Sequence, residues 1–401
     1  MSPRRRSLLV LLVGGLVLAF AADAVVRRPV FTFPRDFLEY WAAGRVNLRG
    51  GDPYHPDELQ IEQERADPSR TEVVMMWNPP PALAVYMPLG AVPVRWATLV
   101  WAGLQLAAVF GACHLLGRTF GRCGPPAPHA DRSHVPHRWF AAVAVSFVGT
   151  WWLLVFGQNT GFMLLGLAGF FHFTTKDRPR TAGAFAALTA LKPHLLAVFG
   201  VLLVAGAITR RGRVALATGA AVIAGALGAA LAANPAVVSQ FVEAARHPAP
   251  GAPALSGWVL PAPAYWLRVW LAPDRFWVQF VPCGLACAAF LAYRLWRGDR
   301  WDWAREAPLV VTVSVLTTPY GGWIFDLTLL LVPVVAAAAR FVDTNRAGAA
   351  TAFVAGQAAV TAATFAWSGE LQAYWWVAPT ALVMCLPALG STPGTPSGDR
   401  S

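Results

Sequence analysis

Residues 181–208 read TAGAFAALTALKPHLLAVFGVLLVAGAI, an apolar stretch with a single charged residue, Lys192, which is followed by Pro193. The stretch is long enough for one helix to cross the roughly 30 Å hydrocarbon core of a bilayer. One crossing would put the basic clusters at 176–180 and 210–213 on opposite sides, whereas Lys and Arg near the ends of spans collect on the cytoplasmic side. Because proline interrupts helices, we predict a break at Lys192-Pro193 and a hairpin that returns both clusters to the cytoplasmic side.

The composition indicates that a membrane covers most of the chain. Hydrophobic residues make up 56% of the 401 residues and the mean hydropathy is +0.48, which excludes a single soluble domain. Apolar stretches of roughly 17 to 25 residues recur along the chain, each long enough for a transmembrane helix and about twice as long as a barrel strand. We therefore predict an all-α polytopic membrane protein, a bundle of about 11–12 transmembrane or re-entrant helices with a long first extracytoplasmic loop.

The basic residues orient this bundle. The net charge of +11 comes from arginines in short clusters between apolar spans, a pattern that argues for membrane topology and against nucleic acid as a partner. The cluster Arg4 to Arg6 would hold the N-terminus in the cytoplasm, with a cleaved signal peptide as the alternative for the apolar run that follows. We expect a multi-pass protein of the inner (plasma) membrane. Its predicted parts are a first transmembrane helix (1–27), a first extracytoplasmic loop with an interfacial or re-entrant segment (28–93), transmembrane helices with a break at 192–193 (94–233), an extracytoplasmic loop (234–275), C-terminal transmembrane helices (276–390) and a cytoplasmic tail (391–401).

This topology gathers the unusual polar residues on the outer face. They lie in the first loop, at the break, in the 234–275 loop and in two turns, 157–159 and 318–320. Transporters, in contrast, usually keep their polar groups near the bilayer midplane. The pattern favours a site at the extracytoplasmic membrane surface.

Asp36 is the candidate for a general base. It follows the first span closely and lies among aromatic residues, where partial burial can raise the pKa of a carboxyl group. The alternative is a helix N-cap, because a helical-looking segment follows it. Tyr40, on that segment, is a candidate to contact the substrate. Glu39 and Arg45 are expected to be solvated or paired with each other.

Three amide side chains are candidates for binding sugar hydroxyls. Asn78 precedes three prolines that prevent a regular span, so this segment should lie in the interface and border a headgroup cavity, or anchor a loop. Gln158 and Asn159 occupy the turn between two predicted spans, where amides also cap helices.

Lys192 is the candidate for binding a phosphate. It lies in an apolar segment without an adjacent carboxylate, and an ionisable residue inside a membrane segment indicates function. An ammonium group is a compact partner for phosphate, although Lys192 could instead extend to the interface. His194 could assist with the phosphate or cap the break. Asp326 is a second membrane carboxylate that would serve catalysis or pair with an arginine such as Arg268.

Six segments in order resemble the glycosyltransferase family 87 group, the polyprenol-phosphate-mannose-dependent mannosyltransferase-like proteins of the C-type glycosyltransferase (GT-C) superfamily. The resemblance covers about residues 30 to 340. The segments are DFLEYWAAG (36–44), GGDPY (50–54), WNPPPALAVYMPLGAVP (77–93), GQNTGFMLL (157–165), ALKPHLLAVF (190–199) and TTPYGGWIFDLTLLLVP (317–333).

The resemblance implies a GT-C-like enzyme that takes mannose from a polyprenyl phosphate on the extracytoplasmic side, with inversion, and passes it to a lipid or glycan acceptor. The family's first-loop aspartate corresponds to Asp36. Relatives often carry Ser-Pro-His where this chain has Thr318-Pro319-Tyr320, so either Tyr320 acts by hydrogen bonding alone or the donor differs. Electrostatic help from Lys192, with Arg268, would let the phosphate leave without a metal or cofactor. The alternatives are a polyprenyl-lipid flippase or transporter and a noncatalytic membrane scaffold.

Overall fold

The structure is a computed structural model that describes residues 34–121, 137–247, 255–343, 347–367 and 370–386. Within these ranges every regular element is a helix, which confirms the predicted all-α class. The expected first span (1–27) and the tail (391–401) lie outside the described residues.

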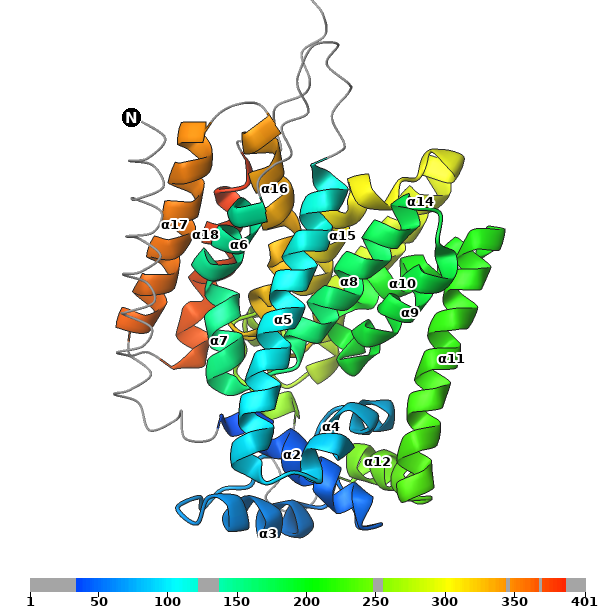
Figure 1. Ribbon diagram of the computed structural model, residues 1–401, viewed down its shortest axis with the longest axis vertical. Helices are drawn as coiled ribbons and strands as arrows, with labels where there is room; N and C mark the ends of the chain where they lie inside the picture. Colours follow the sequence, from blue (N-terminus) through cyan, green and yellow to red (C-terminus); the bar gives the residue numbers. More distant parts are fainter. Residues whose placement is uncertain (1–33, 122–136, 248–254, 344–346, 368–369, 387–401) are drawn as a thin grey trace, which may run out of the picture.

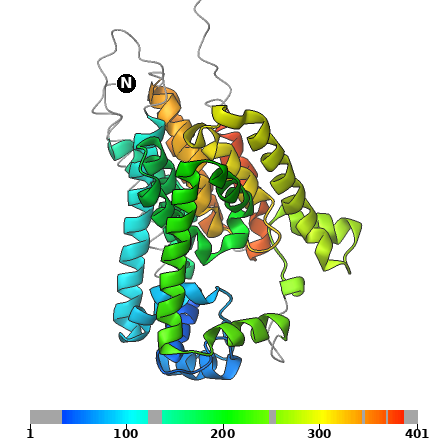
Figure 2. The same cartoon turned by 90° about the vertical axis from the view of Figure 1, so that its right-hand side faces the viewer.

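The helices form a layer and a bundle (Figure 1). The layer, which we call the α2 layer, contains α2 (Arg35–Leu48), α3 (Pro56–Ala66), α4 (Leu83–Gly90) and α12 (Val237–Arg246). Figures 1 and 2 show α5 and α11 running from this layer to the opposite end of the molecule. The bundle comprises α5 (Val94–Phe120), α6 (His137–Ser146), α7 (Val148–Phe156), α8 (Thr160–Thr175), α9 (Pro179–Ala186), α10 (Ala197–Ala205), α11 (Arg210–Ala233), α13 (Pro263–Leu271), α14 (Val281–Arg297), α15 (Trp303–Leu316), α16 (Leu331–Asp343), α17 (Ala347–Ala366) and α18 (Val377–Val383).

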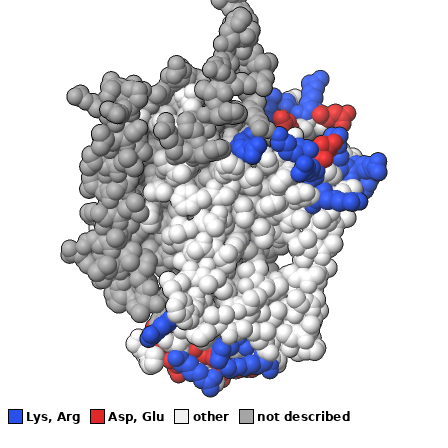
Figure 3. All heavy atoms as spheres, in the orientation of Figure 1, with Lys and Arg blue, Asp and Glu red and all other residues white. Residues whose placement is uncertain are grey.

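Several bundle helices are suited to a bilayer. Four described helices are long and apolar enough to span one, and the pair α6 and α7, bent by 58° at its break, would make a fifth. The four are Val94–Phe120, Arg210–Ala233, Phe276–Arg300 and Gly348–Ala366; shorter apolar helices occupy Thr160–Thr175 and Pro193–Ile208. Figure 3 shows charged side chains at the two ends of one face and an uncharged band between them. Both observations support a polytopic membrane protein.

The stretch at 181–208 is broken at Lys192. Helix α9 continues as a 3-10 turn to Leu191, and a second 3-10 turn begins at Pro193. Lys192 between them has φ −141° and ψ 74°, which is not helical. Proline explains the interruption, since its ring disfavours a helical residue before it. The two basic clusters meet at the end opposite the α2 layer, where Arg211 binds Asp177 at 2.7 Å.

Glycines allow α2 and α4 to pack closely in the α2 layer. A Cβ atom on Gly44 would lie 2.4 Å from the carbonyl oxygen of Tyr86, and one on Gly90 would lie 2.4 Å from the nitrogen of Arg45. Beneath this crossing, Glu62 of α3 binds Arg45 at 2.9 Å, and also Arg49. These contacts hold α2 in place, and α2 carries Asp36 in its first turn.

Candidate active site

The turn between α7 and α8 lies directly against the start of α2. Gly157 has φ +69°, and a Cβ atom there would lie 2.5 Å from the Cβ of Phe37 and 2.8 Å from that of Pro34. Only glycine tolerates both this φ and this proximity. Trp101 of α5 donates to the Gly157 carbonyl at 2.7 Å. The turn therefore presents its next residue, Gln158, to the first turn of α2.

Four segments that are far apart in the sequence meet in one hydrogen-bonded chain, which we call the Asp36–Asp326 network. The Gln158 amide nitrogen donates to Oδ2 of Asp36 at 2.5 Å. The amide oxygen of Gln158 accepts from Tyr40 Oη at 2.7 Å and from Lys192 Nζ. Lys192 Nζ also lies 3.2 Å from Oδ1 of Asp326. A carboxylate and an ammonium group are thus linked through one fixed amide.

Asp36 does not cap its helix. Helix α2 begins at Arg35 with Pro34 as its N-cap, and no side chain caps it, so the N-cap alternative is wrong. Asp36 remains partly exposed. The surrounding protein raises its pKa by burial, against the lowering effects of the hydrogen bond from Gln158 and the charge of Lys192. A raised pKa and an accessible oxygen are the properties of a carboxylate that can accept a proton.

Lys192 has a carboxylate partner, contrary to the expectation from its local sequence. The partner, Asp326, is 134 positions away in the chain, and its side chain is only 1% exposed. Asp326 also accepts from Thr160 Oγ1 at 3.0 Å and from the Trp323 backbone at 3.2 Å. Among the described residues, Gln158 and Asp326 accept from two of the three N–H bonds of the ammonium.

Tyr86 organises the other predicted amides. Its hydroxyl accepts from Asn78 Nδ2 at 2.7 Å and from Asn159 Nδ2 at 2.6 Å. Its ring stacks on Tyr40 with a centroid distance of 4.5 Å. Asn78 and Asn159 therefore lie beside the Asp36–Asp326 network, to which Tyr86 connects them by stacking on Tyr40. Sequence analysis did not single out Tyr86, although it is the only polar side chain of its apolar helix, LAVYMPLG.

Glu39 is a second carboxylate beside Asp36, one helical turn further along α2. It is buried and accepts a long hydrogen bond of 3.4 Å from the Trp77 backbone. Burial and the neighbouring charge of Asp36 raise its pKa. Both expectations for Glu39 are wrong: its side chain is buried and not solvated, and Arg45 binds Glu62 in its place. The spacing of i and i+3 from Asp36 was the signal that could have identified Glu39.

The remaining predicted residues fall into two groups. His194, two residues after Lys192, stacks on Tyr320 with ring centroids 4.2 Å apart. Arg268 donates to the Ser256 carbonyl at 2.9 Å and contacts the ring of Tyr265, which belongs to the hydrophobic cluster against which Tyr320 packs. The suggested pairing of Asp326 with Arg268 is wrong, since Lys192 takes that place.

Comparison with known proteins identifies one family. The family model described as Glycosyltransferase family 87 matches residues 77–319, which is more than half of the chain and includes Gln158, Asn159 and Lys192. Asp36 and Asp326 lie outside the matched residues. No curated protein and no solved structure matches the chain.

Proposed function

The chain belongs to glycosyltransferase family 87, and we propose that this membrane glycosyltransferase moves a sugar from a polyprenyl-phosphate donor to a lipid or glycan acceptor at the Asp36–Asp326 network. Mannose is the proposed sugar, on the resemblance of the motifs. The observation that carries the proposal is the single amide, Gln158, that joins Asp36 to Lys192. It brings together a proton acceptor and a cation for phosphate, the two groups that this transfer requires.

The proposed reaction is one displacement. The acceptor hydroxyl gives its proton to Asp36 while its oxygen attacks C1 of the sugar from the face opposite the phosphate. The bond between C1 and the phosphate oxygen breaks, and polyprenyl phosphate leaves with the electron pair. Lys192 stabilises the charge that develops on the phosphate. The anomeric configuration inverts, and Asp36 later returns the proton to water.

An apolar groove supports the lipid nature of the donor. It has a volume of about 520 Å³ and is lined by apolar residues of α10 and by Leu291 of α14, with Pro193 at one end. Pro193 directly follows Lys192, and Figure 2 shows α14 at the margin of the bundle. We propose that the prenyl chain of the donor lies in this groove, beside the chain segment that carries Lys192.

The proposed side of the membrane follows from the charges. The basic clusters around Arg180 and Arg210 lie at the end opposite the α2 layer (Figure 1). If those clusters are cytoplasmic, as the positive-inside rule predicts, the Asp36–Asp326 network faces the extracytoplasmic surface of the inner membrane. We further propose that the bundle is of the GT-C type.

A transfer assay tests this function. Purified protein in lipid vesicles would receive polyprenyl phosphate carrying radiolabelled mannose, together with a membrane lipid extract. We expect a labelled glycolipid or lipid-linked glycan and an equal amount of free polyprenyl phosphate. Glucose-bearing and galactose-bearing donors, run in parallel, identify the sugar. A product formed from a nucleotide sugar and from none of the polyprenyl donors would contradict the proposal, and movement of the donor across the bilayer without transfer would indicate a flippase.

A further inference from the structure

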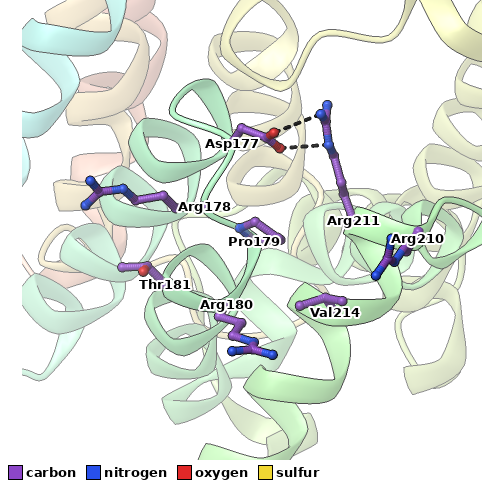
Figure 4. Close-up of a pocket in the computed structure, with 8 residues that line it drawn as sticks. All are labelled: Asp177, Arg178, Pro179, Arg180, Thr181, Arg210, Arg211 and Val214. Carbon is purple, nitrogen blue, oxygen red and sulfur yellow. Dashed lines mark hydrogen bonds and ion pairs between the residues drawn. The ribbon is translucent and has the colours of Figure 1, made fainter.

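An open pocket of about 530 Å³ lies at the end of the molecule opposite Asp36. It forms where the turn after α8 meets the beginnings of α9 and α11 (Figure 4). We call it the arginine pocket; its wall includes Asp177, Arg178, Arg180, Arg210, Arg211 and Val214. The proposed transfer reaction uses none of these residues.

The charges of the arginine pocket do not balance. Asp177, its only carboxylate, is bound twice by Arg211, with Nε–Oδ1 at 2.7 Å and Nη2–Oδ2 at 2.8 Å (Figure 4). In the described part of the chain, the other three arginines of the wall make no ion pair. The wall therefore carries three arginines without a carboxylate partner among the described residues; Arg180 and Arg210 lie on one side, and the Arg178 side chain extends away from them (Figure 4).

The helix ends add to this positive charge. Arg180 is the second residue of α9, and Arg210 is the first residue of α11. Neither helix has an acidic residue in its first turn. Cations at a helix N-terminus are unfavourable, because the unpaired N–H groups there already carry partial positive charge. At α11 the Thr209 side chain already accepts from the Gly212 N–H at 3.0 Å, so a bound anion would act there mainly by offsetting the positive charge.

The surroundings of the pocket are apolar and suit a lipid. Helix α11 is one of the four helices that can span a bilayer, and most of its apolar window is exposed. Val214 of α11 lines the pocket. Val204 and Ile208, which precede α11, are 60% and 70% exposed. A ligand here would contact arginine side chains at one end and an exposed apolar surface beside them.

We propose that the arginine pocket binds the phosphate headgroup of an anionic phospholipid, whose acyl chains lie along the exposed apolar face of α11. Arginine suits this ligand because its planar guanidinium can donate two hydrogen bonds to one phosphate. Basic pockets between membrane helices on the cytoplasmic side recognise such headgroups. The inference is independent of sugar transfer at the opposite end.

Lipid titration of the full chain tests this site. The affinity for phosphatidylglycerol, measured by native mass spectrometry in a zwitterionic detergent, is compared between the native protein and a variant with Arg178→Gln, Arg180→Gln and Arg210→Gln. We expect a loss of about 100-fold, at about fivefold for each arginine near an anionic headgroup. The matched control carries Arg118→Gln, Arg300→Gln and Arg305→Gln, which remove the same charge. Because these arginines do not line the pocket, the control should change the affinity by less than about threefold.

Two further measurements distinguish a phospholipid headgroup from free phosphate as the bound anion. The affinity for phosphatidylcholine should be the same for the three proteins. The melting temperatures of the proteins in phosphatidylcholine establish that each variant is folded. Inorganic phosphate at millimolar concentration should not displace phosphatidylglycerol. Native affinity in the pocket variant, an equal loss in the control, or full displacement by inorganic phosphate would each overturn the proposal.

Discussion

Two ion pairs at opposite ends of the molecule show how differently the same chemistry can be used. Lys192 and Asp326 pair at 3.2 Å with side chains that are 11% and 1% exposed, whereas Arg211 and Asp177 pair at 2.7 Å with side chains that are 75% and 59% exposed. The shorter pair is largely exposed, at the edge of the arginine pocket. The buried pair belongs to a network that reaches Asp36. Burial and connection, rather than distance, distinguish the pair on which the proposed function depends.

Removal of the carboxylate should give the largest difference in the free energy of unfolding between the two ion pairs. Asp326→Ala leaves Lys192 without its counter-ion in a buried position, and we expect the free energy of unfolding to fall by about 3–5 kcal/mol. Asp177→Ala, the matched control, should lower it by about 1 kcal/mol or less. Reversible unfolding in mixed detergent micelles measures both. Equal effects of the two substitutions would remove the distinction between the pairs.

The two lysines of the chain offer a second comparison, this time in donor binding. Lys192→Gln keeps a donor for Asp326 and loses the charge, so the apparent KM for the polyprenyl donor should rise by an amount equivalent to about 1.5–3 kcal/mol. Lys176→Gln replaces an exposed lysine at the other end and should leave the KM unchanged. Steady-state transfer assays measure both. A loss of folded protein with native donor affinity would show that Lys192 is structural.

The pH dependence of kcat/KM should be set by Asp36 in the Asp36–Asp326 network and not by the exposed ion pair. Because burial raises the pKa of Asp36 above its ordinary value, the ionised form that accepts a proton is lost as the pH falls through that raised pKa. Below that pKa, kcat/KM should fall about tenfold per pH unit. The residual activity of Asp36→Asn should lack this acid limb. An acid limb that persists in Asp36→Asn would assign the titration to another group, with Glu39 the nearest.

The smallest expected effect concerns salt. The exposed pair should contribute about 0–1 kcal/mol to the free energy of unfolding at low ionic strength, and almost nothing at 1 M salt, where charges are screened over about 3 Å. The destabilisation caused by Arg211→Gln should therefore disappear at high salt, while that caused by Asp326→Ala persists. Denaturation curves at 0.1 M and 1 M salt test this. A salt-independent effect of Arg211→Gln would indicate a structural role beyond the ion pair.

These comparisons also show what the sequence could and could not predict. Helical class and family follow from features that are local in the chain: apolar length, proline and ordered motifs. The pairing of Lys192 with Asp326 is not local, because it depends on how segments 134 positions apart pack together. Glu39 looked like an ordinary surface charge until the packing of α2 buried it. The N-cap alternative for Asp36 failed because α2 begins at Arg35, two residues before Phe37, where a helix capped by Asp36 would begin.

The central claim, that Asp36 accepts the proton of the acceptor, is tested most directly by the Asp36→Asn enzyme. Asparagine has nearly the same shape and cannot accept the proton, so the folded variant should bind the polyprenyl donor normally. Its transfer rate should be lower by a factor of about 100 or more, the scale of general-base catalysis. Donor affinity and single-turnover transfer, measured on the same preparation, give both numbers. Near-normal transfer by Asp36→Asn would contradict the claim and make Asp326 and Tyr320 the residues to test next.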